Sequence, residues 1–354
     1  MWVMQGGAVR QSAAVSAVLM AVLFFMPLVA VTPFRTELFF GEIPQNEGSR
    51  EPISVQEADG IDASVTLRVL QESGAVEEMT LDRYLLGVIR AEMPAAFEPE
   101  ALKAQTVAAR TYTRYKMRHG GAHGDMADLC TSPACCQAYL ERERAWENWG
   151  AAAETYETKL AKAVAETAGE VILYNGEPIL AVFHSSSSGR TQGAEAVWQE
   201  RLPYLQAVVS PEEGESIPNY YSRVAFSVEE LRERIRNALP ETNLSGEPQG
   251  WLSRAVTDES GNVETVDVGG LTVKGSRLRS ILGLRSACFS WEIQGGEFIF
   301  FVTGYGHGVG MSQYGANRMA AQGADYRTIL THYYTGVVIE LWNQGESFAI
   351  APNL

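Results

Sequence analysis

Residues 81–117 read LDRYLLGVIRAEMPAAFEPEALKAQTVAARTYTRYKM, and this stretch carries the strongest helical pattern in the chain. Apolar side chains recur in it at the spacing of one helix face, at Leu81, Leu85, Val88 and Ile89. Pro94 ends this first helix, and Pro99 suits the first turn of a second one. Small side chains in the second helix let a neighbouring element pack closely: Ala101, Ala104, Ala108 and Ala109. The stretch therefore predicts two consecutive helices with a short break between them.

Glu92 lies at the break between the two predicted helices, where a carboxyl group can face a cleft instead of open water. Partly apolar surroundings favour the protonated form of a carboxyl group, which is the form that a general acid needs at neutral pH. From the pattern alone, a glutamate that caps a helix or is solvated is the more common case. Glu92 is thus a candidate acid that needs further support.

The size and charge of the chain limit what it can be. Its 354 residues are enough for one large domain or two ordinary ones with proper cores. The composition, 46% hydrophobic and 20% charged, is that of a soluble globular protein. The formal net charge is −15 and the sequence has no basic stripe, which argues against nucleic acid as a partner.

An apolar run at residues 13–31 is interrupted only by Ser16 and Pro27, and Arg10 lies just before it. A segment of this length can cross a bilayer. A cleavable signal peptide is the alternative, but its apolar region is usually shorter, and this run ends LVAVTP without a clear A-x-A site. We predict an uncleaved single-pass membrane anchor within residues 1–35, with the N-terminus inside and most of the chain outside the cytoplasm.

The rest of the chain alternates between strand and helix patterns. A polar, acid-rich tether is predicted for residues 36–62, one folded domain for 63–340 and a tail for 341–354. Strand patterns lie at 64–70, before Thr80, and on both sides of Asn175-Gly176 and of Gly295-Gly296. Helical patterns lie at 151–167, 228–239 and 313–334. This mixture predicts an α+β fold with two lobes and a cleft.

Two local signals are specific enough to predict geometry. The pair Asn175-Gly176 suits a two-residue type I′ turn, and therefore predicts a β-hairpin over 171–183. The segment FSVEEL at 226–231 has the arrangement of a capping box with a hydrophobic staple, and predicts that a helix begins after Ser227.

Four hydroxyl groups in a row, Ser185 to Ser188, follow directly on a predicted strand and precede Gly189. Such a polar loop can hydrogen-bond a sugar or an anion. It is not the G-x-S-x-G elbow of an α/β-hydrolase, which argues against a serine nucleophile. The alternative interpretation, a flexible serine-rich turn, stays open from the pattern alone.

Residues 304–315 read GYGHGVGMSQYG, with glycine at every second position in the first half. Glycines at this density let the backbone approach a ligand or pack tightly. The block has neither the Gly-Lys-Ser/Thr of a P-loop nor the spacing of G-x-G-x-x-G, so it implies no nucleotide. His307 in this block is either a core histidine held by the backbone or a part of a site.

The cysteines are Cys130, Cys135, Cys136 and the distant Cys288. Three clustered thiols with His119 and His123 nearby can supply a tetrahedral zinc site. Outside the cytoplasm, the competing interpretation is a disulfide from Cys130 to one of the adjacent pair. The sequence has no H-E-x-x-H, so a zinc protease is not supported.

Several separate blocks, in the same order, resemble the stage II sporulation protein D family. They are LDRYLLGVIRAEMP with KAQTVAARTYT, the cysteine loop ending CQAYL, FHSSSSGRT followed by VW, VKGSRLRSILGLRSACF, and GYGHGVGMSQYGANRMA. The resemblance covers about Ile61 to Ile339, and the apolar N-terminal segment also fits the pattern of the family.

The resemblance implies a lytic transglycosylase that cleaves peptidoglycan glycan strands between N-acetylmuramic acid and N-acetylglucosamine and leaves 1,6-anhydro ends. It places the catalytic acid at Glu92. It further implies action in sporulation and engulfment, on strands first stripped of peptides by a partner amidase, at the cell membrane in the septal or intermembrane space, together with other membrane-bound sporulation proteins.

The groove that would hold the glycan is predicted around Glu92. Polar groups at strand ends, at glycine turns and on the helix after Glu92 are expected to line it: Arg110, Tyr112, Ser185, Ser186, Ser187, Ser188, Tyr305, His307 and Gln313.

The resemblance also implies a structural zinc ion. Cys130 and Cys136 match the two cysteines of the family pattern, Cys135 stands where a histidine is expected, and the upstream ligand is His123 or, less well placed, His119. Two other functions stay open. The first is a non-catalytic cell-wall-binding enhancer of an amidase. The second is a zinc amidase, which is disfavoured because three thiolates and an imidazole leave no open position for water.

Overall fold

The computed structural model describes residues 60–119, 123–198 and 200–342. This part of the chain separates into two compact units, and the chain passes between them more than once. One unit, here called the helical unit, lies within residues 29–182, 319–332 and 336–354; the other, the sheet unit, comprises 183–318 and 333–335. The mixture of helices with several small sheets confirms the predicted α+β class, whereas the predicted cleft between lobes stays a prediction.

The helical unit begins with a small sheet that leads directly into the first helix. Strands β1 (Thr66–Leu70) and β2 (Val76–Thr80) are antiparallel, and the short β3 (Leu129–Cys130) pairs in parallel with β1. Gly74 turns the hairpin with a φ of 85°, a conformation that favours glycine. The first residue of α2 (Leu81–Glu92) follows β2 without a loop, so the sheet fixes where α2 starts.

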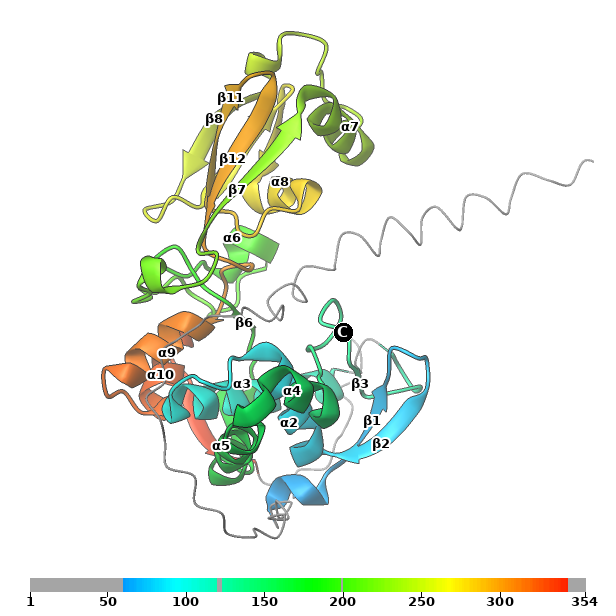
Figure 1. The fold of residues 1–354 in the computed structure, drawn as a ribbon, viewed down its shortest axis with the longest axis vertical. Helices are drawn as coiled ribbons and strands as arrows, with labels where there is room; N and C mark the ends of the chain where they lie inside the picture. The colour runs from blue at the N-terminus through cyan, green and yellow to red at the C-terminus, as the bar shows by residue number, and fades with distance from the viewer. Residues whose placement is uncertain (1–59, 120–122, 199, 343–354) are drawn as a thin grey trace, which may run out of the picture. The chain divides into compact units, whose positions relative to one another are not determined.

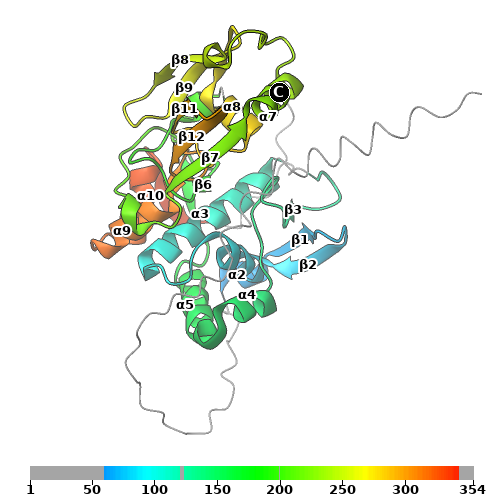
Figure 2. The same cartoon turned by 45° about the horizontal axis from the view of Figure 1, so that its top comes forward.

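Four helices form the body of this unit: α2, α3 (Pro99–Arg118), α4 (Arg142–Trp149) and α5 (Ala153–Glu166). The long α3 packs against α2 and α5, as both views show (Figures 1 and 2). The predicted pair of consecutive helices at 81–117 is confirmed, with Pro99 at the first position of α3. Helix α4 was not predicted, because its sequence RERAWENW has mostly polar side chains and only Ala145 is buried.

The second sheet of the helical unit confirms the Asn-Gly turn. Strands β4 (Glu170–Tyr174) and β5 (Glu177–Pro178) pair Leu173 with Pro178, which leaves Asn175 and Gly176 as a two-residue turn, both with positive φ. The return strand predicted at 179–183 is wrong: β5 holds only Glu177 and Pro178, and Phe183 begins the separate strand β6 (Phe183–His184). On its other side β4 pairs with β14 (Val338–Leu341) near the end of the chain.

The sheet unit consists mainly of two three-stranded sheets and two helices around one core. The elements are β7 (Tyr221–Ser227), α7 (Val228–Ala238), β8 (Leu252–Thr257), β9 (Val263–Val268), β10 (Leu271–Lys274), α8 (Gly275–Leu282), β11 (Phe289–Gln294) and β12 (Glu297–Thr303). The strand orders are β10-β9-β8 and β11-β12-β7, and α7 and α8 lie together beside the strands in both views (Figures 1 and 2). The core includes Trp251, Leu278, Phe298 and Phe300.

The helix start predicted from FSVEEL is confirmed as α7, where the Ser227 hydroxyl caps the helix by accepting a hydrogen bond of 3.1 Å from the Glu230 N–H. The strand pair around Gly295-Gly296 is confirmed as β11 and β12. The sheet of β8, β9 and β10 was not predicted.

The remaining elements are short. They are β6 (Phe183–His184), α6 (Ala194–Trp198), β13 (Met311–Ser312), α9 (Gln313–Ala321), α10 (Tyr326–Tyr333) and the 3-10 turns Ile61–Ser64, Gly150–Ala152, Gly214–Ser216 and Pro248–Gly250. The two closing helices α9 and α10 agree with the helical pattern at 313–334.

Within residues 60–119, 123–198 and 200–342, no helix has the length and apolar character needed to span a membrane. The predicted anchor at 13–31, and nearly all of the predicted tether and tail, lie outside the described residues.

Candidate active site and thiol cluster

Glu92 is the last residue of α2, and the sequence explains why the helix ends there. Met93 takes up extended backbone geometry, with a φ of −130° and a ψ of 136°, and donates its N–H to the Ile89 carbonyl as the helix cap. Residues before a proline avoid helical geometry, and Pro94 follows. The partial negative charge of a helix C-terminus also disfavours a carboxylate there and so favours the protonated acid.

The Glu92 carboxyl group is partly buried and has one defined hydrogen-bond donor. Its Oε1 accepts a hydrogen bond of 2.8 Å from the backbone N–H of Ala138. Burial raises the pKa of Glu92 to about 7, and the hydrogen bond from Ala138 opposes this rise. At neutral pH the group is therefore close to equally divided between acid and carboxylate, which suits a residue that must donate a proton and later accept one.

Glu98, the nearest acidic residue in sequence, is exposed, and the next nearest, Glu100 and Asp82, are engaged in structural contacts. Glu100 accepts hydrogen bonds from the Lys103 ammonium at 2.8 Å and from the Tyr326 N–H at 3.0 Å. The Asp82 side chain accepts the N–H of Arg83 at the start of α2. Arg90, two residues before the end of α2, forms a buried ion pair with Glu157. These contacts leave Glu92 as the candidate proton donor of this region.

The segment 137–140 runs along α2 and carries the donor that meets Glu92. Leu140 donates its N–H to the Gly87 carbonyl at 3.0 Å, one helical turn and a half before Glu92. The Tyr139 ring lies directly over Gly87, where an added Cβ would come within 2.0 Å of it. Glycine at this position therefore allows the segment to approach α2 closely, and sequence analysis missed this role.

His123, Cys130, Cys135 and Cys136 form a cluster immediately before this segment. Their ligand atoms all lie within 4.8 Å of one another, and the Cys135 sulfur is 3.4 Å from Nε2 of His123. All the cysteines are free thiols in the described residues. The cluster contains the four residues named from the sequence as a zinc set, and the number and type of donor atoms fit tetrahedral zinc.

The backbone explains why the sulfurs converge. Strand β3 brings Cys130 alongside Leu70 of β1, and a tight turn then reverses the chain, with the N–H groups of Cys135 and Cys136 donating to the Ser132 carbonyl at 3.1 and 2.8 Å. The N–H of Cys130 donates to the Cys136 sulfur at 3.4 Å. A hydrogen bond from Cys136 is the main reason that the pKa of Cys130 falls to about 5. One thiolate is thus favoured before any cation binds.

His119, the alternative upstream ligand, lies apart from this cluster. Its Nδ1 is 2.8 Å from the Tyr115 carbonyl of the preceding turn, and its ring stacks on the Tyr115 ring. His119 therefore closes α3, and His123 is the histidine beside the thiols.

Arg110 does not line a groove, which corrects the sequence-based expectation. Its side chain is fully buried, pairs with Asp62 at 2.8 Å and donates to the Glu170 carbonyl at 3.1 Å. The guanidinium has its partners inside the protein, and a polysaccharide has no access to it. Tyr112 is partly buried, and its hydroxyl donates to the Cys135 carbonyl at 3.4 Å, so it supports the thiol cluster; a contact with glycan stays a prediction.

The serine loop and the glycine block come together within the sheet unit. Strand β6 pairs in parallel with β13, and Ser186 and Tyr305 exchange backbone hydrogen bonds of 3.0 and 2.8 Å. The glycines are needed for this approach: Gly306 has a φ of 122°, and an added Cβ would lie 2.6 Å from Cβ of His184. The two motifs therefore form one structural feature.

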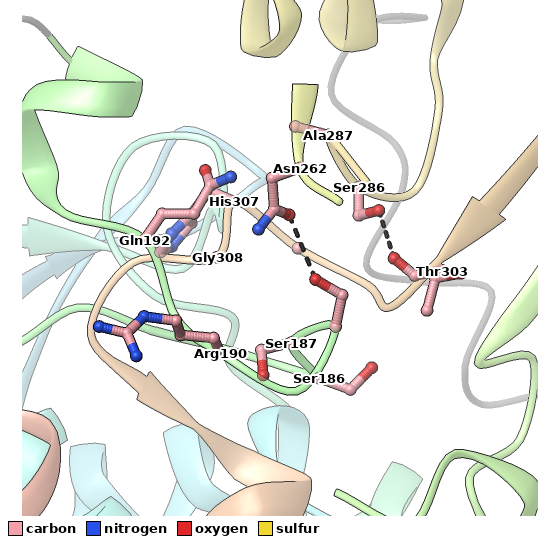
Figure 3. Close-up of a pocket in the computed structure, with 12 residues that line it drawn as sticks. Ser186, Ser187, Arg190, Gln192, Asn262, Ser286, Ala287, Thr303, His307 and Gly308 are labelled. Carbon is pink, nitrogen blue, oxygen red and sulfur yellow. Dashed lines mark hydrogen bonds between the residues drawn. The ribbon is translucent and has the colours of Figure 1, made fainter. Parts of the chain in front are cut away.

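A polar pocket lies where these segments meet, and Figure 3 shows its side chains converging from several elements. Its lining consists of Ser186, Ser187, Ser188, Arg190, Gln192, Asn262, Ser286, Ala287, Thr303, Gly306, His307 and Gly308. Among the residues expected to bind substrate, Ser186, Ser187, Ser188 and His307 line it. Ser186, Ser187 and Gln313 are nevertheless only 2%, 4% and 5% exposed.

Several polar groups of this region form hydrogen bonds within the protein. Ser187 donates both its N–H and its hydroxyl to Oε1 of Glu212 at 2.8 Å, and the Ser312 hydroxyl donates to the same oxygen. Glu212 was missed in the sequence, where it is one of three acidic residues between Pro211 and Ser216 with no pattern around them.

The two histidines of this region are neutral. Burial lowers the pKa of His184 to about 4 and that of His307 to about 3. Nδ1 of His184 faces the Val309 carbonyl at 3.1 Å and so carries the proton, whereas Nδ1 of His307 accepts the Val309 N–H at 3.1 Å. The interpretation of His307 as a histidine held by the backbone agrees with these bonds.

The chain has an α+β fold, and the carboxyl group at the end of helix α2 is a candidate acid catalyst. A model of the stage II sporulation protein family matches residues 70–174. Stage II sporulation protein D of Bacillus subtilis (strain 168) is 35% identical over 336 residues, which cover 93% of this chain and 96% of that relative. The corresponding protein of Bacillus amyloliquefaciens is 35% identical over 338 residues, 93% of this chain and 95% of the relative. The chain belongs to the stage II sporulation protein D family.

A more distant similarity connects the chain to a protein with a different name. A protein of Bacillus subtilis (strain 168) named amidase enhancer is 28% identical over 302 residues, which cover 72% of this chain and 40% of that protein.

Proposed function

We propose that this protein is a lytic transglycosylase that cleaves the bond between N-acetylmuramic acid and N-acetylglucosamine in peptidoglycan. The observation that carries the proposal is the partly buried Glu92 at the end of α2, with its pKa raised to about 7. Membership of a sporulation protein family supports a role in remodelling the cell wall during sporulation and engulfment.

One carboxyl group is sufficient for this reaction. Protonated Glu92 donates its proton to the glycosidic oxygen as the bond from that oxygen to C1 of N-acetylmuramic acid breaks. The resulting carboxylate then removes the proton from the C6 hydroxyl of the same sugar, whose oxygen attacks C1 and closes the 1,6-anhydro ring. Water is not consumed, Glu92 regains its proton, and the attacking group is already held in place by the sugar ring.

The proposal includes a structural role for the thiol cluster. We propose that His123, Cys130, Cys135 and Cys136 hold a zinc ion, which when bound would supply a four-coordinate cross-link of the loop between α3 and α4. Thiolate ligation also protects these cysteines from oxidation outside the cytoplasm. The family relationship further supports membrane attachment, a peptide-stripped glycan substrate and cooperation with an amidase, all as parts of the proposal.

The alternative is a non-catalytic enhancer of an amidase, which the similarity to the protein named amidase enhancer favours. An enhancer has no need of an acid with a raised pKa, so the environment of Glu92 argues for the enzyme.

The deciding experiment is digestion of purified glycan strands, both peptide-stripped and intact, with the wild-type protein and with Glu92→Gln. Mass spectrometry identifies the products. Anhydro ends from the wild type but not from the Gln variant support the lytic transglycosylase. Peptide release that a chelator abolishes would instead indicate an amidase, and no product from either substrate would support the enhancer.

A further inference from the structure

The thiol cluster and the candidate acid are joined by a very short piece of chain. Cys136 is the last residue of the cluster, and Ala138, two residues later, donates the hydrogen bond of 2.8 Å to Glu92. The only residue between them is Gln137, whose side chain is 2% exposed and accepts a hydrogen bond from the Thr113 hydroxyl of α3 at 3.3 Å. Movement of Cys136 therefore reaches the Ala138 N–H through two peptide units.

The far end of the segment is anchored independently of the cluster. Leu140 is bonded to the Gly87 carbonyl, and the Tyr139 ring lies over Gly87 and stacks on the Tyr84 ring with centroids 5.9 Å apart. The downstream half is thus fixed on α2. The position of the Ala138 N–H then depends on the upstream side, where the buried Gln137 contacts Thr113 and Cys136 belongs to the cluster.

Without a cation, the three sulfurs are the least constrained atoms of the upstream side. The backbone of the turn is held by the pairing of the two-residue β3 with β1 and by the N–H groups of Cys135 and Cys136 on the Ser132 carbonyl, whereas the sulfurs make only sulfur hydrogen bonds, such as the 3.7 Å contact between Cys135 and Cys136. Sulfur is a weak hydrogen-bond partner, so these contacts hold the three sulfurs loosely although the ligand atoms lie within 4.8 Å of one another. A cation bound by the four ligand atoms would fix all three sulfurs.

We propose that the cysteine–histidine cluster is a positioning element for Glu92: a cation on the cluster fixes Cys136 and thereby holds the Ala138 N–H against Oε1 of the acid. This inference rests on the proposed roles of Glu92 and of the cluster. It assigns to the loop a function in the reaction, beyond the local cross-link that a structural metal provides.

The direction of the effect follows from the chemistry of the hydrogen bond. An N–H donor stabilises the carboxylate more than the protonated acid, so its loss raises the pKa of Glu92 further above about 7. The other titratable groups that face this region, Arg90, Tyr84 and Tyr112, add no opposing charge there. Arg90 is turned to Glu157, and burial followed by the charge of the neighbouring cysteines raises the pKa of Tyr84 and Tyr112, which stay neutral phenols.

Two measurements on the full chain test the inference without any glycan. The first is the titration of the Glu92 side-chain carbon by NMR in protein carrying ¹³C-labelled glutamate, with zinc bound and after chelation. The second is the hydrogen-exchange rate of the Ala138 amide in the same two states. On removal of zinc we expect the Glu92 titration midpoint to rise by about one pH unit and exchange at Ala138 to accelerate roughly tenfold or more.

Substitutions distinguish the effect of the cluster from the effect of the Ala138 N–H donor. Cys136→Ser weakens the cluster and should reproduce both changes, whereas the control Cys288→Ser, a thiol outside the cluster, should reproduce neither. Because Cys136→Ser can impair folding, a backbone ester at position 138 (Ala138→lactic acid) gives a second route. It removes only the N–H, so it should raise the titration midpoint with zinc still bound and make it insensitive to chelation.

An unchanged Glu92 after chelation would contradict the inference. If chelation lowers the melting temperature while the Glu92 titration and the Ala138 exchange stay unchanged, the cluster is a local cross-link and the inference is wrong. The proposed enzymatic function fails on different grounds, namely activity that survives Glu92→Gln, so the two failures are distinguishable.

Discussion

Two polar regions of this protein make opposite use of their charged groups. In the helical unit, Glu92 stands at a helix end with one backbone donor and a pKa raised to about 7. In the sheet unit, Glu212 gathers three donors on one oxygen, from Ser187 and Ser312. The first environment keeps a proton available for transfer, whereas the second ties the carboxyl oxygen into the internal hydrogen bonds of the serine loop. The comparison teaches that a carboxyl group's donors, more than its place in a polar motif, decide whether it can do acid–base chemistry.

The largest expected effect is on turnover at Glu92. Glu92→Gln keeps the size of the side chain and can still accept the Ala138 N–H, but it can neither donate nor accept the proton. We expect cleavage of peptide-stripped strands to fall by about a thousandfold or more, with circular dichroism unchanged. Glu98→Gln, an exposed glutamate six residues away, is the matched control and should stay near wild type. A Gln variant with a substantial fraction of wild-type activity would remove Glu92 from the role of acid.

Substitution of Arg110 tests whether its buried ion pair with Asp62 stabilises the helical unit. Arg110→Met leaves Asp62 buried without its counter-charge, so the free energy of unfolding should fall by about 3–5 kcal/mol. Arg118→Met breaks a pair with Glu177 whose side chains are 33% and 54% exposed, and should cost at most about 1 kcal/mol. Urea unfolding of the two variants provides the measurement. If Arg110→Met instead raised the KM for glycan at unchanged stability, the groove role predicted from the sequence would return.

The raised pKa of Glu92 also predicts a pH-dependent stability. The folded state holds this proton more tightly than the unfolded state, whose ordinary value is near 4.5, so the free energy of unfolding decreases as the pH rises from about 4.5 to about 7. Gln does not ionise and escapes this loss. We expect Glu92→Gln to gain about 1–3 kcal/mol relative to the wild type between pH 5 and pH 8. The same difference in unfolding free energy at both pH values would show that the carboxyl group is not shifted.

Sequence reasoning succeeded where one local rule decides the outcome. Pro99 at the start of α3, the positive φ at Asn175 and Gly176, and the Ser227 cap each follow from the chemistry of a few neighbouring residues. It also brought together the residues of the thiol cluster, because three sulfurs in seven positions limit the possible arrangements.

It failed where a contact joins distant segments and leaves no local pattern. The partner of Arg110 is Asp62, which lies 48 residues away, in a stretch that sequence analysis assigned to the tether. The Ala138 donor is a backbone group, and its approach to Glu92 depends on Gly87 having no side chain. A single sequence carries no signal of either contact.

The smallest expected effects distinguish neighbouring serines in the sheet unit. Ser187→Ala removes one hydroxyl donor from Glu212 but keeps the N–H, and should cost about 1–2 kcal/mol of unfolding free energy. Ser186→Ala is the matched control, because the Ser186 hydroxyl is buried without a hydrogen-bond partner in the described part of the chain. Its removal should be neutral or slightly stabilising, since a buried unpaired hydroxyl costs free energy.

The same two variants, assayed for glycan binding, test whether the serine loop binds a ligand or only surrounds Glu212. A loss of affinity in Ser186→Ala at unchanged stability would mean that its free hydroxyl serves a ligand, and that the serine loop is the binding surface expected from its sequence. Wild-type affinity in both variants would instead assign the loop to the internal framework around Glu212.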